Sequence, residues 1–274
     1  MTENNNNIQK PKPRILSVVN QKGGVGKTTT TVNLATALAA VGKHVLIIDF
    51  DPQGNASTGL GIEGNDRDIT SYDVILNDIS LTEATKKTVV PNLNVIPATI
   101  DLTGAEIEMV SLVRREYRLK TAIDNCQDYY DYILIDCPPS LGLLTLNALT
   151  ASDAVLIPLQ TEFYALEGLS HLMRTIKLVQ SGLNPELMIQ GIILTMYDRR
   201  NKFTEQIEND VRDYFGDQVY QAVIPRNIRM SEAPSHGKPA LIYDMKCAGS
   251  KAYIAMASEL LKREKHLQQE LTAA

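Results

Sequence analysis

The sequence predicts an α/β protein with one doubly wound, mostly parallel sheet that is flanked by helices. Apolar runs typical of buried strands alternate with helical patterns along most of the chain. A glycine-rich segment lies between the first apolar run and the first helical pattern, where a phosphate-binding loop belongs. The chain has 274 residues and is 44% hydrophobic, which suits one large domain with a substantial core.

The glycine-rich segment, residues 21–29, follows an apolar run at 15–19 and precedes a helical pattern at 30–41. Glycines let successive backbone N–H groups point at one anion, and the following helix adds its partial positive charge. Lys27 can reach the β- and γ-phosphates of a nucleotide, and the Thr28 hydroxyl can ligate Mg²⁺. The predicted phosphate-binding residues are Lys22, Gly23, Gly24, Val25, Gly26, Lys27, Thr28 and Thr29.

A second buried strand is predicted at residues 44–49, and two carboxylates, Asp49 and Asp51, stand at its end. Parallel sheets bind ligands at the carboxyl ends of their strands. We expect Asp51 to orient or deprotonate an attacking water and Asp49 to hold Mg²⁺ through a water. The alternative is a solvated pair of carboxylates that caps the turn at Pro52 and Gly54.

The middle of the chain contributes a third acid. Residues 59–91 are polar and broken, with short helical pieces at 70–76 and 81–85, and predict a peripheral insert. A short strand at 93–98 and a long helix at 102–128 follow. The buried run 132–136 ends in Asp136 and continues into Cys-Pro-Pro, a Walker-B-like arrangement. We expect Asp136 to bind Mg²⁺ through its water shell and the Pro-Pro turn to sense the γ-phosphate.

The alternation continues to the C-terminus. Helices are predicted at 141–149, 169–180, 203–215 and from about 249, and strands at 154–158, 188–196 and ending at 223–227. Residues 1–13, with four consecutive Asn, predict a flexible tail, which leaves 14–274 as the nucleotide-binding domain. The 3 Cys lack metal-ligand spacing and indicate reduced cytosolic thiols. No apolar run approaches the ~18–20 residues that span a bilayer, and no signal peptide is expected.

The net charge of −5 means that any DNA binding must come from a local basic patch. Basic residues concentrate at 199–202 and more loosely at 226–251. Such side chains can neutralise phosphates without reading sequence, although scattered solvated charges are the alternative. The predicted DNA contacts are Arg199, Arg200, Lys202, Arg229, Lys246 and Lys251. Arg226 is left open, because it could serve the nucleotide instead.

These motifs resemble those of the ParA/Soj partition proteins, which belong to the deviant Walker A ATPases together with MinD-type regulators and nitrogenase iron proteins. The usual phosphate loop has Gly where this chain has Gln21, and the additional lysine of the deviant group is Lys22. The string Asp-x-Asp-Pro-Gln-Gly-Asn at 49–55 is similar to the family's first switch. Further matches lie at 136–139, 195–198, 224–229 and 232–235, and the resemblance spans residues 14 to about 261.

The resemblance implies a P-loop NTPase fold, ATP and Mg²⁺ as cofactors, slow ATP hydrolysis and catalytic roles for Lys22, Lys27 and Asp51. It further implies that Lys22 reaches across a homodimer to the partner's nucleotide and that the loop 160–168 lies at the dimer interface. The residues that it places on the adenine are Pro225, Arg226 and Asn227. The ATP-bound sandwich dimer would bind double-stranded DNA non-specifically in the cytoplasm, on the nucleoid. A ParB-type protein would then stimulate hydrolysis and drive chromosome or plasmid segregation.

The main alternative is a MinD-type regulator, whose basic amphipathic terminal helix binds membrane. A stripe at the end of this chain is formed by Tyr253, Met256, Leu260, Leu267 and Leu271. Glutamates alternate with the basic residues there, so a docked helix and no membrane contact are expected. An iron–sulfur reductase would need cysteine ligands that the pattern lacks, and a non-catalytic nucleotide-gated scaffold is the remaining alternative.

Overall fold

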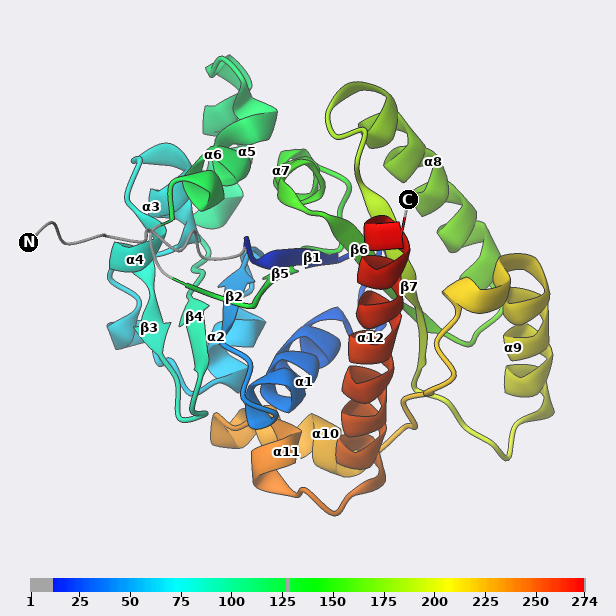
Figure 1. Cartoon of the computed structure of the whole chain (residues 1–274). Coiled ribbons are helices and arrows are strands. Elements are labelled where there is room, and N and C mark those ends of the chain that lie inside the picture. Colours follow the sequence, from blue (N-terminus) through cyan, green and yellow to red (C-terminus); the bar gives the residue numbers. More distant parts are fainter. Residues whose placement is uncertain (1–11, 127–128, 274) are drawn as a thin grey trace, which may run out of the picture.

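The computed structural model describes residues 12–126 and 129–273 and contains a seven-stranded sheet in the order β3-β4-β2-β5-β1-β6-β7 (Figure 1). All neighbouring strands pair in parallel except β3 and β4, so the predicted mostly parallel sheet is confirmed. The strands are β1 Arg14–Val18, β2 Val45–Asp49, β3 Lys86–Lys87, β4 Leu93–Ile96, β5 Tyr132–Asp136, β6 Ala154–Gln160 and β7 Met188–Thr195. The predicted tail falls outside the described residues for positions 1–11.

Helices cover both faces of the sheet, as a doubly wound fold requires. They are α1 Lys27–Ala40, α2 Asn55–Gly59, α3 Ser71–Leu76, α4 Leu81–Ala84, α5 Leu102–Glu108, α6 Arg118–Asp124, α7 Leu143–Ala151, α8 Ala165–Gly182, α9 Lys202–Phe215, α10 Ile228–Glu232, α11 Ala240–Tyr243 and α12 Ala248–Ala273. One apolar core lies under α3 to α9, and a second joins α1, α2 and α10 to α12 on the opposite face.

Two predicted elements are wrong. The long helix expected at 102–128 is divided into α5, two 3₁₀ turns and α6, with Arg114 between the turns at φ 55°. A left-handed residue cannot continue an α-helix, so the helical pattern is interrupted there. The strand expected to end at 223–227 is an extended segment with isolated bridges, one of which joins Tyr197 to Pro225. Since these bridges are single, the segment does not become an eighth strand.

The terminal helix α12 is docked on α1, as the sequence predicted. Tyr253, Met256 and Leu260 are buried in the core that α12 shares with α1, and the Tyr253 hydroxyl lies 3.0 Å from that of Thr30. Leu267 is half-buried, and the side chain of Leu271 lies outside the described part of the structure. Among the helices of the described residues, none is sufficiently long and apolar to cross a bilayer.

Candidate functional site

The phosphate loop connects β1 to α1 at the carboxyl edge of the sheet (Figure 1). Gly24 and Gly26 have φ values of 76° and 88°, a backbone conformation that residues with a side chain rarely adopt. Gly26 is also the N-cap of α1, and its carbonyl accepts the amide of Thr30 at 2.9 Å. The glycines therefore direct the loop into the N-terminus of α1, where an anion would meet the positive end of the helix dipole.

Lys27, at the first position of α1, is 6% exposed. Its Nζ donates a hydrogen bond to the Lys22 carbonyl at 2.9 Å, and this bond links the two ends of the phosphate loop. Burial lowers the pKa of Lys27, and the nearby charge of Asp136 partly opposes this effect. The ammonium group is thus held inside the loop before any phosphate arrives, so little reorganisation is needed to bind one.

Asp49 and Asp136 end the neighbouring strands β2 and β5 in direct register, and both are fully buried. Burial away from water raises the pKa of Asp136 to about 8 and that of Asp49 to about 6, and a neighbouring carboxylate adds to each effect, Asp49 for Asp136 and Asp51 for Asp49. Asp136 Oδ1 accepts the Thr31 hydroxyl at 2.9 Å, whereas its Oδ2 is buried without a hydrogen-bond partner among the described residues.

These observations fit a magnesium ion, which prefers oxygen ligands and retains several waters. A cation would relieve the repulsion between the two carboxylates and would satisfy Asp136 Oδ2. No group of three or more His, Cys, Asp or Glu in residues 12–126 and 129–273 is arranged to hold a metal. The ion would therefore depend on the Thr28 hydroxyl, nucleotide phosphates and water besides Asp136.

The two carboxylates at the end of β2, Asp49 and Asp51, have different surroundings. Asp49 Oδ2 accepts both the backbone amide of Ser57 at 2.8 Å and its hydroxyl at 2.6 Å. These bonds fasten the segment 51–59, which overlaps the predicted first switch at 49–55, to the end of β2. Asp51 is 6% exposed, and its Oδ1 accepts the amide of Gln53 at 3.0 Å. Within the described part of the chain, Asp51 Oδ2 accepts no hydrogen bond, whereas Asp49 anchors the segment. The roles predicted for Asp51 with water and for Asp49 with magnesium stay predictions.

Lys22 lies at the exposed mouth of the loop and forms an ion pair with Glu162, in the segment between β6 and α8. The carboxamide of Gln21 donates to the Gly168 carbonyl at 3.2 Å, a second contact with the same region. Phe163 and Tyr164, beside Glu162, are 72% and 64% exposed. Both lysines of the motif are therefore found at the loop, one buried and one at its rim, with an exposed aromatic surface next to the rim.

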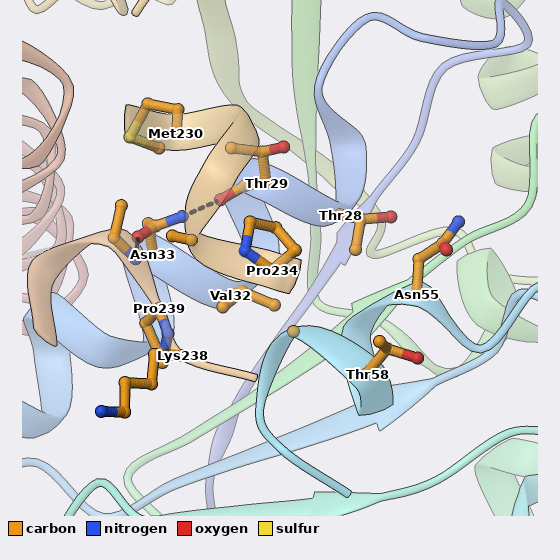
Figure 2. Close-up of a pocket in the computed structure, with 13 residues that line it drawn as sticks. Thr28, Thr29, Val32, Asn33, Asn55, Thr58, Met230, Pro234, Lys238 and Pro239 are labelled. Atoms are coloured by element: carbon orange, nitrogen blue, oxygen red, sulfur yellow. Dashed lines mark hydrogen bonds between the residues drawn. The ribbon is translucent and has the colours of Figure 1, made fainter. Parts of the chain in front are cut away.

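A cavity of about 250 Å³ adjoins the first turn of α1 (Figure 2). It lies between α1, α2 and the segment 230–240, and Thr28, Thr29 and Asn55 are among its lining residues. Asn33 closes one side, since its Nδ2 donates to the Thr29 carbonyl at 2.9 Å while its Oδ1 accepts the Ala240 amide at 2.9 Å. Because α2 follows directly on the predicted first switch and lines this cavity, a movement of the segment 51–59 would reshape the cavity.

The segment predicted to pack on adenine lies beside the end of β7. The amide of Arg226 donates to the Tyr197 carbonyl at 3.2 Å, and Pro225 is half-exposed next to it. Asn227 is the N-cap of α10, and its side-chain oxygen accepts the Arg229 amide at 2.9 Å. Asn227 therefore has a structural role that the sequence did not indicate. The adenine contacts of all three residues stay predictions.

The predicted DNA contacts divide into two groups. Arg199, Arg200 and Lys251 line one open groove of about 930 Å³, together with Arg226. The other predicted contacts, Lys202, Arg229 and Lys246, are not among the residues that line this groove. We call this pocket the basic groove, and its four cations are Arg199, Arg200, Arg226 and Lys251.

The cations of the two groups also differ in their ion pairs. Arg200 is paired side-on with Asp198, through bonds of 2.9 and 2.8 Å, and these bonds lower the pKa of Asp198 to about 2. Arg229 pairs with Glu232 at 2.8 Å and with Asp244 at 3.6 Å. Within the described residues, the other three basic-groove cations have no carboxylate at ion-pair distance.

Four residues support the site through contacts that the sequence did not indicate: Thr31, Ser57, Glu162 and Thr195. Thr31 had a recognisable signal, because it lies one helical turn after Lys27 and Thr28 and so shares their face of α1. Ser57 and Glu162 had none, because their partners are close only after folding. Cys137 is buried, as expected for a plain thiol.

Comparisons with known proteins agree with this geometry. A family model described as an AAA domain matches residues 13–189. The chain is similar to the chromosome partitioning protein ParA of Caulobacter vibrioides, with 59% identity over 93% of this chain and 96% of that protein. It is also similar to the sporulation initiation inhibitor protein Soj of Bacillus subtilis, with 56% identity over 90% of this chain and 98% of the relative.

A solved structure extends the comparison to bound ligands. It is named as cobyrinic acid a,c-diamide synthase from Mycobacterium smegmatis and holds an ATP analogue and magnesium. It superposes with a TM-score of 0.81 at 38% identity, over 92% of this chain and 96% of that one.

Proposed function

Because the chain belongs to the ParA/Soj family of chromosome-partitioning ATPases, we propose that it uses ATP binding and hydrolysis to control its hold on DNA during segregation. Its cofactors are ATP and Mg²⁺, which fit the closed phosphate loop and the buried carboxylates at the ends of β2 and β5. The observation that carries the proposal is the position of the basic groove. The groove begins just after β7, and the last residue of β7 is hydrogen-bonded to the phosphate loop. Residues 14–274 act as one ATPase domain in this proposal.

The residues of the site divide the chemistry among them. Lys27 binds the β- and γ-phosphates, and the backbone amides of the loop surround them. The magnesium ion would be held by the Thr28 hydroxyl and Asp136 and would supply charge neutralisation at the phosphates. Asp51 orients the attacking water or accepts its proton, since its Oδ2 is not used by the Gln53 amide. Pro225 and Arg226 support the adenine.

Lys22 completes the site in a second subunit. In the single chain it is paired with Glu162 at the rim of the loop, where its side chain is half exposed. In an ATP-bound sandwich dimer it leaves this pair and contacts the partner's nucleotide, so the pair opposes dimerisation until ATP is present. The exposed Phe163 and Tyr164 beside it are suited to the same interface.

The dimer would then hold DNA through the basic groove without reading its sequence, since the groove offers phosphate-binding cations on an open surface. A ParB-type protein would stimulate hydrolysis and so release the DNA. The γ-phosphate must favour the dimer for this cycle to work, and hydrolysis must remove that preference. A cytoplasmic, nucleoid-associated location follows from this proposal.

The test is sedimentation with non-specific duplex DNA and, separately, with anionic liposomes, each with ATP, ADP or no nucleotide. We expect the protein to sediment with DNA only when ATP is present and to remain in the supernatant with liposomes. Binding to liposomes without binding to DNA would favour a MinD-type regulator. A phosphate-release assay in the same samples separates an ATPase from a non-catalytic scaffold.

A further inference from the structure

A buried hydrogen bond joins the phosphate loop to the strand that leads into the basic groove. The hydroxyl of Thr195, the last residue of β7, donates to the Val25 carbonyl at 2.8 Å. Thr195 is 2% exposed and Val25 is 1% exposed, so water does not compete for this bond. The Thr195 side chain also lies 3.9 Å from where a Cβ on Gly26 would stand, which places it directly against the loop backbone.

The position of this bond makes it sensitive to the nucleotide. The Val25 carbonyl and the Gly26 amide belong to one planar trans peptide group, in which the C=O and N–H bonds point in opposite directions within the plane. In a phosphate loop the backbone amides turn toward the phosphates. When phosphate fixes the direction of the Gly26 N–H bond, the Val25 C=O bond is fixed in the opposite direction, toward the Thr195 hydroxyl that donates to it.

The basic groove begins immediately after Thr195. Met196 has φ 50°, a left-handed conformation that is rare for a residue with a long side chain. Tyr197 follows and is fastened on both sides, because its amide donates to Ile224 at 3.0 Å and its carbonyl accepts the Arg226 amide at 3.2 Å. The next residues are the Asp198–Arg200 turn of the groove.

We propose that Thr195 is a positioning residue that makes the placement of the Asp198–Arg200 turn depend on phosphate in the loop, with Met196 as the strained joint between them. A shift of the Val25 carbonyl moves the end of β7, and the strained joint passes that movement to the Tyr197–Arg226 pair and so to the groove cations. This inference rests on the proposed function for its consequence, ATP-dependent DNA binding, but the coupling itself can be measured without DNA.

The experiment compares wild type, Thr195→Val and Thr195→Ser. Valine keeps the shape of threonine and removes the donor, whereas serine retains the hydroxyl. Hydrogen exchange of the amides in residues 196–202 is measured with ATP, ADP and no nucleotide, and ATP affinity is measured by titration of a fluorescent ATP analogue. We expect ATP to slow exchange by roughly fivefold or more in wild type and Thr195→Ser, the usual range for coupled sites, and to have almost no effect in Thr195→Val.

A matched control separates coupling from general loss of a buried hydroxyl. Thr150 is 2% exposed and donates to the Leu146 carbonyl at 2.7 Å within α7, away from this path. Thr150→Val should retain the full ATP effect on exchange. A second variant, Met196→Gly, relaxes the joint without removing the hydroxyl, because glycine adopts positive φ freely, and it should weaken the ATP effect at unchanged ATP affinity. If Thr195→Val does not fold, the ATP effect on exchange in Met196→Gly tests the proposal in its place.

The outcomes are distinct. If ATP slows exchange in Thr195→Val as in wild type, the inference is wrong. If the ATP affinity of Thr195→Val falls by more than about tenfold, Thr195 only supports the phosphate loop. This result would also contradict the proposed coupling role. Sedimentation of the same variants with DNA reports on the proposed function. Wild type that shows ATP-dependent exchange but never binds DNA would refute that function and leave the coupling intact.

Discussion

The phosphate loop and the basic groove both collect positive charge, but they hold it in different ways. Lys27 is buried and hydrogen-bonded inside a loop whose residues are consecutive in the sequence. The cations of the basic groove come from three separate segments and face solvent. One of them, Arg200, is paired with an adjacent carboxylate.

This difference predicts how each region responds to mutation. A buried cation acts in a low dielectric, so a single residue carries a large share of the binding energy. Exposed cations act through screened, additive contacts, each of which contributes little and depends on salt. Large single-residue effects are therefore expected at the phosphate loop, and small, salt-dependent ones at the groove.

The largest effect is expected from Lys27→Ala. It removes the buried ammonium group that we propose binds the β-phosphate, and loss of one partner of a buried charge pair costs about 2–5 kcal/mol, or roughly 30-fold or more in affinity. Isothermal titration with ADP measures this loss in the single subunit. Lys22→Ala is the matched control, because Lys22 lies at the exposed rim and should leave ADP affinity nearly unchanged. Equal losses in the two variants would contradict the contrast between buried and exposed lysines.

Asp51→Ala is expected to abolish hydrolysis while ATP binding persists. Loss of a positioned acid–base group usually lowers kcat by about 10²–10⁴-fold. Among the described residues no hydrogen bond joins Asp51 to Lys27, although the Asp51 charge acts on the Lys27 ammonium, so most of the affinity for ATP should remain. Single-turnover phosphate release and size-exclusion chromatography with ATP measure both consequences, and the ATP-bound dimer should accumulate.

Asp51→Asn controls for the turn that Asp51 supports. The asparagine oxygen can still accept the Gln53 amide, whereas it cannot take a proton from water. Asp51→Asn should therefore lose hydrolysis with its thermal unfolding unchanged. Normal hydrolysis in this variant would remove Asp51 from the proposed mechanism.

The contrast also explains how far the sequence could predict the molecule. The phosphate loop and the acids Asp49, Asp51 and Asp136 were predictable because each follows an apolar run whose strand was recognisable. Strand β5 has the predicted bounds, residues 132–136, since uninterrupted apolar residues define a strand that is buried on both faces. The positions of the phosphate loop and of these acids in the fold could therefore be predicted from local sequence patterns.

The remaining features depend on contacts between distant segments. The division of the region 102–128 follows from the backbone at Arg114, which no periodicity reveals. The basic groove forms because folding brings Lys251 of α12 close to residues 199–200, which are distant in the sequence. The ion pair between Arg200 and Asp198 likewise cannot be deduced from the number of charges. The sequence therefore offers these basic residues as candidates but cannot separate those that line the groove from the rest.

A smaller effect is expected at the groove, and it should be specific to the residues that line it. Arg199→Ala with Lys251→Ala removes two groove cations and should flatten the salt dependence of DNA binding by about 0.9 log unit for each lost phosphate contact. Lys202→Ala with Lys246→Ala makes the same charge change outside the groove. This double variant should retain most of the salt dependence of DNA binding. Fluorescence anisotropy with labelled duplex DNA at several salt concentrations measures both slopes. Identical slopes in the two double variants would show that net charge, not the groove, governs binding.

The smallest effect is expected from Arg200→Ala alone. Its guanidinium is paired side-on with Asp198, a carboxylate that is ionised at neutral pH and whose pKa this pairing lowers to about 2. Arg200 therefore contributes little net charge to a phosphate, and its loss should change DNA affinity less than Arg199→Ala does. Asp198→Asn sharpens the comparison, because it frees Arg200 and should steepen the salt slope by up to ~0.9 log unit. If Asp198→Asn instead weakens DNA binding, the pair orients Arg200 toward DNA rather than neutralising it, and the groove would resemble the phosphate loop in relying on a preorganised cation.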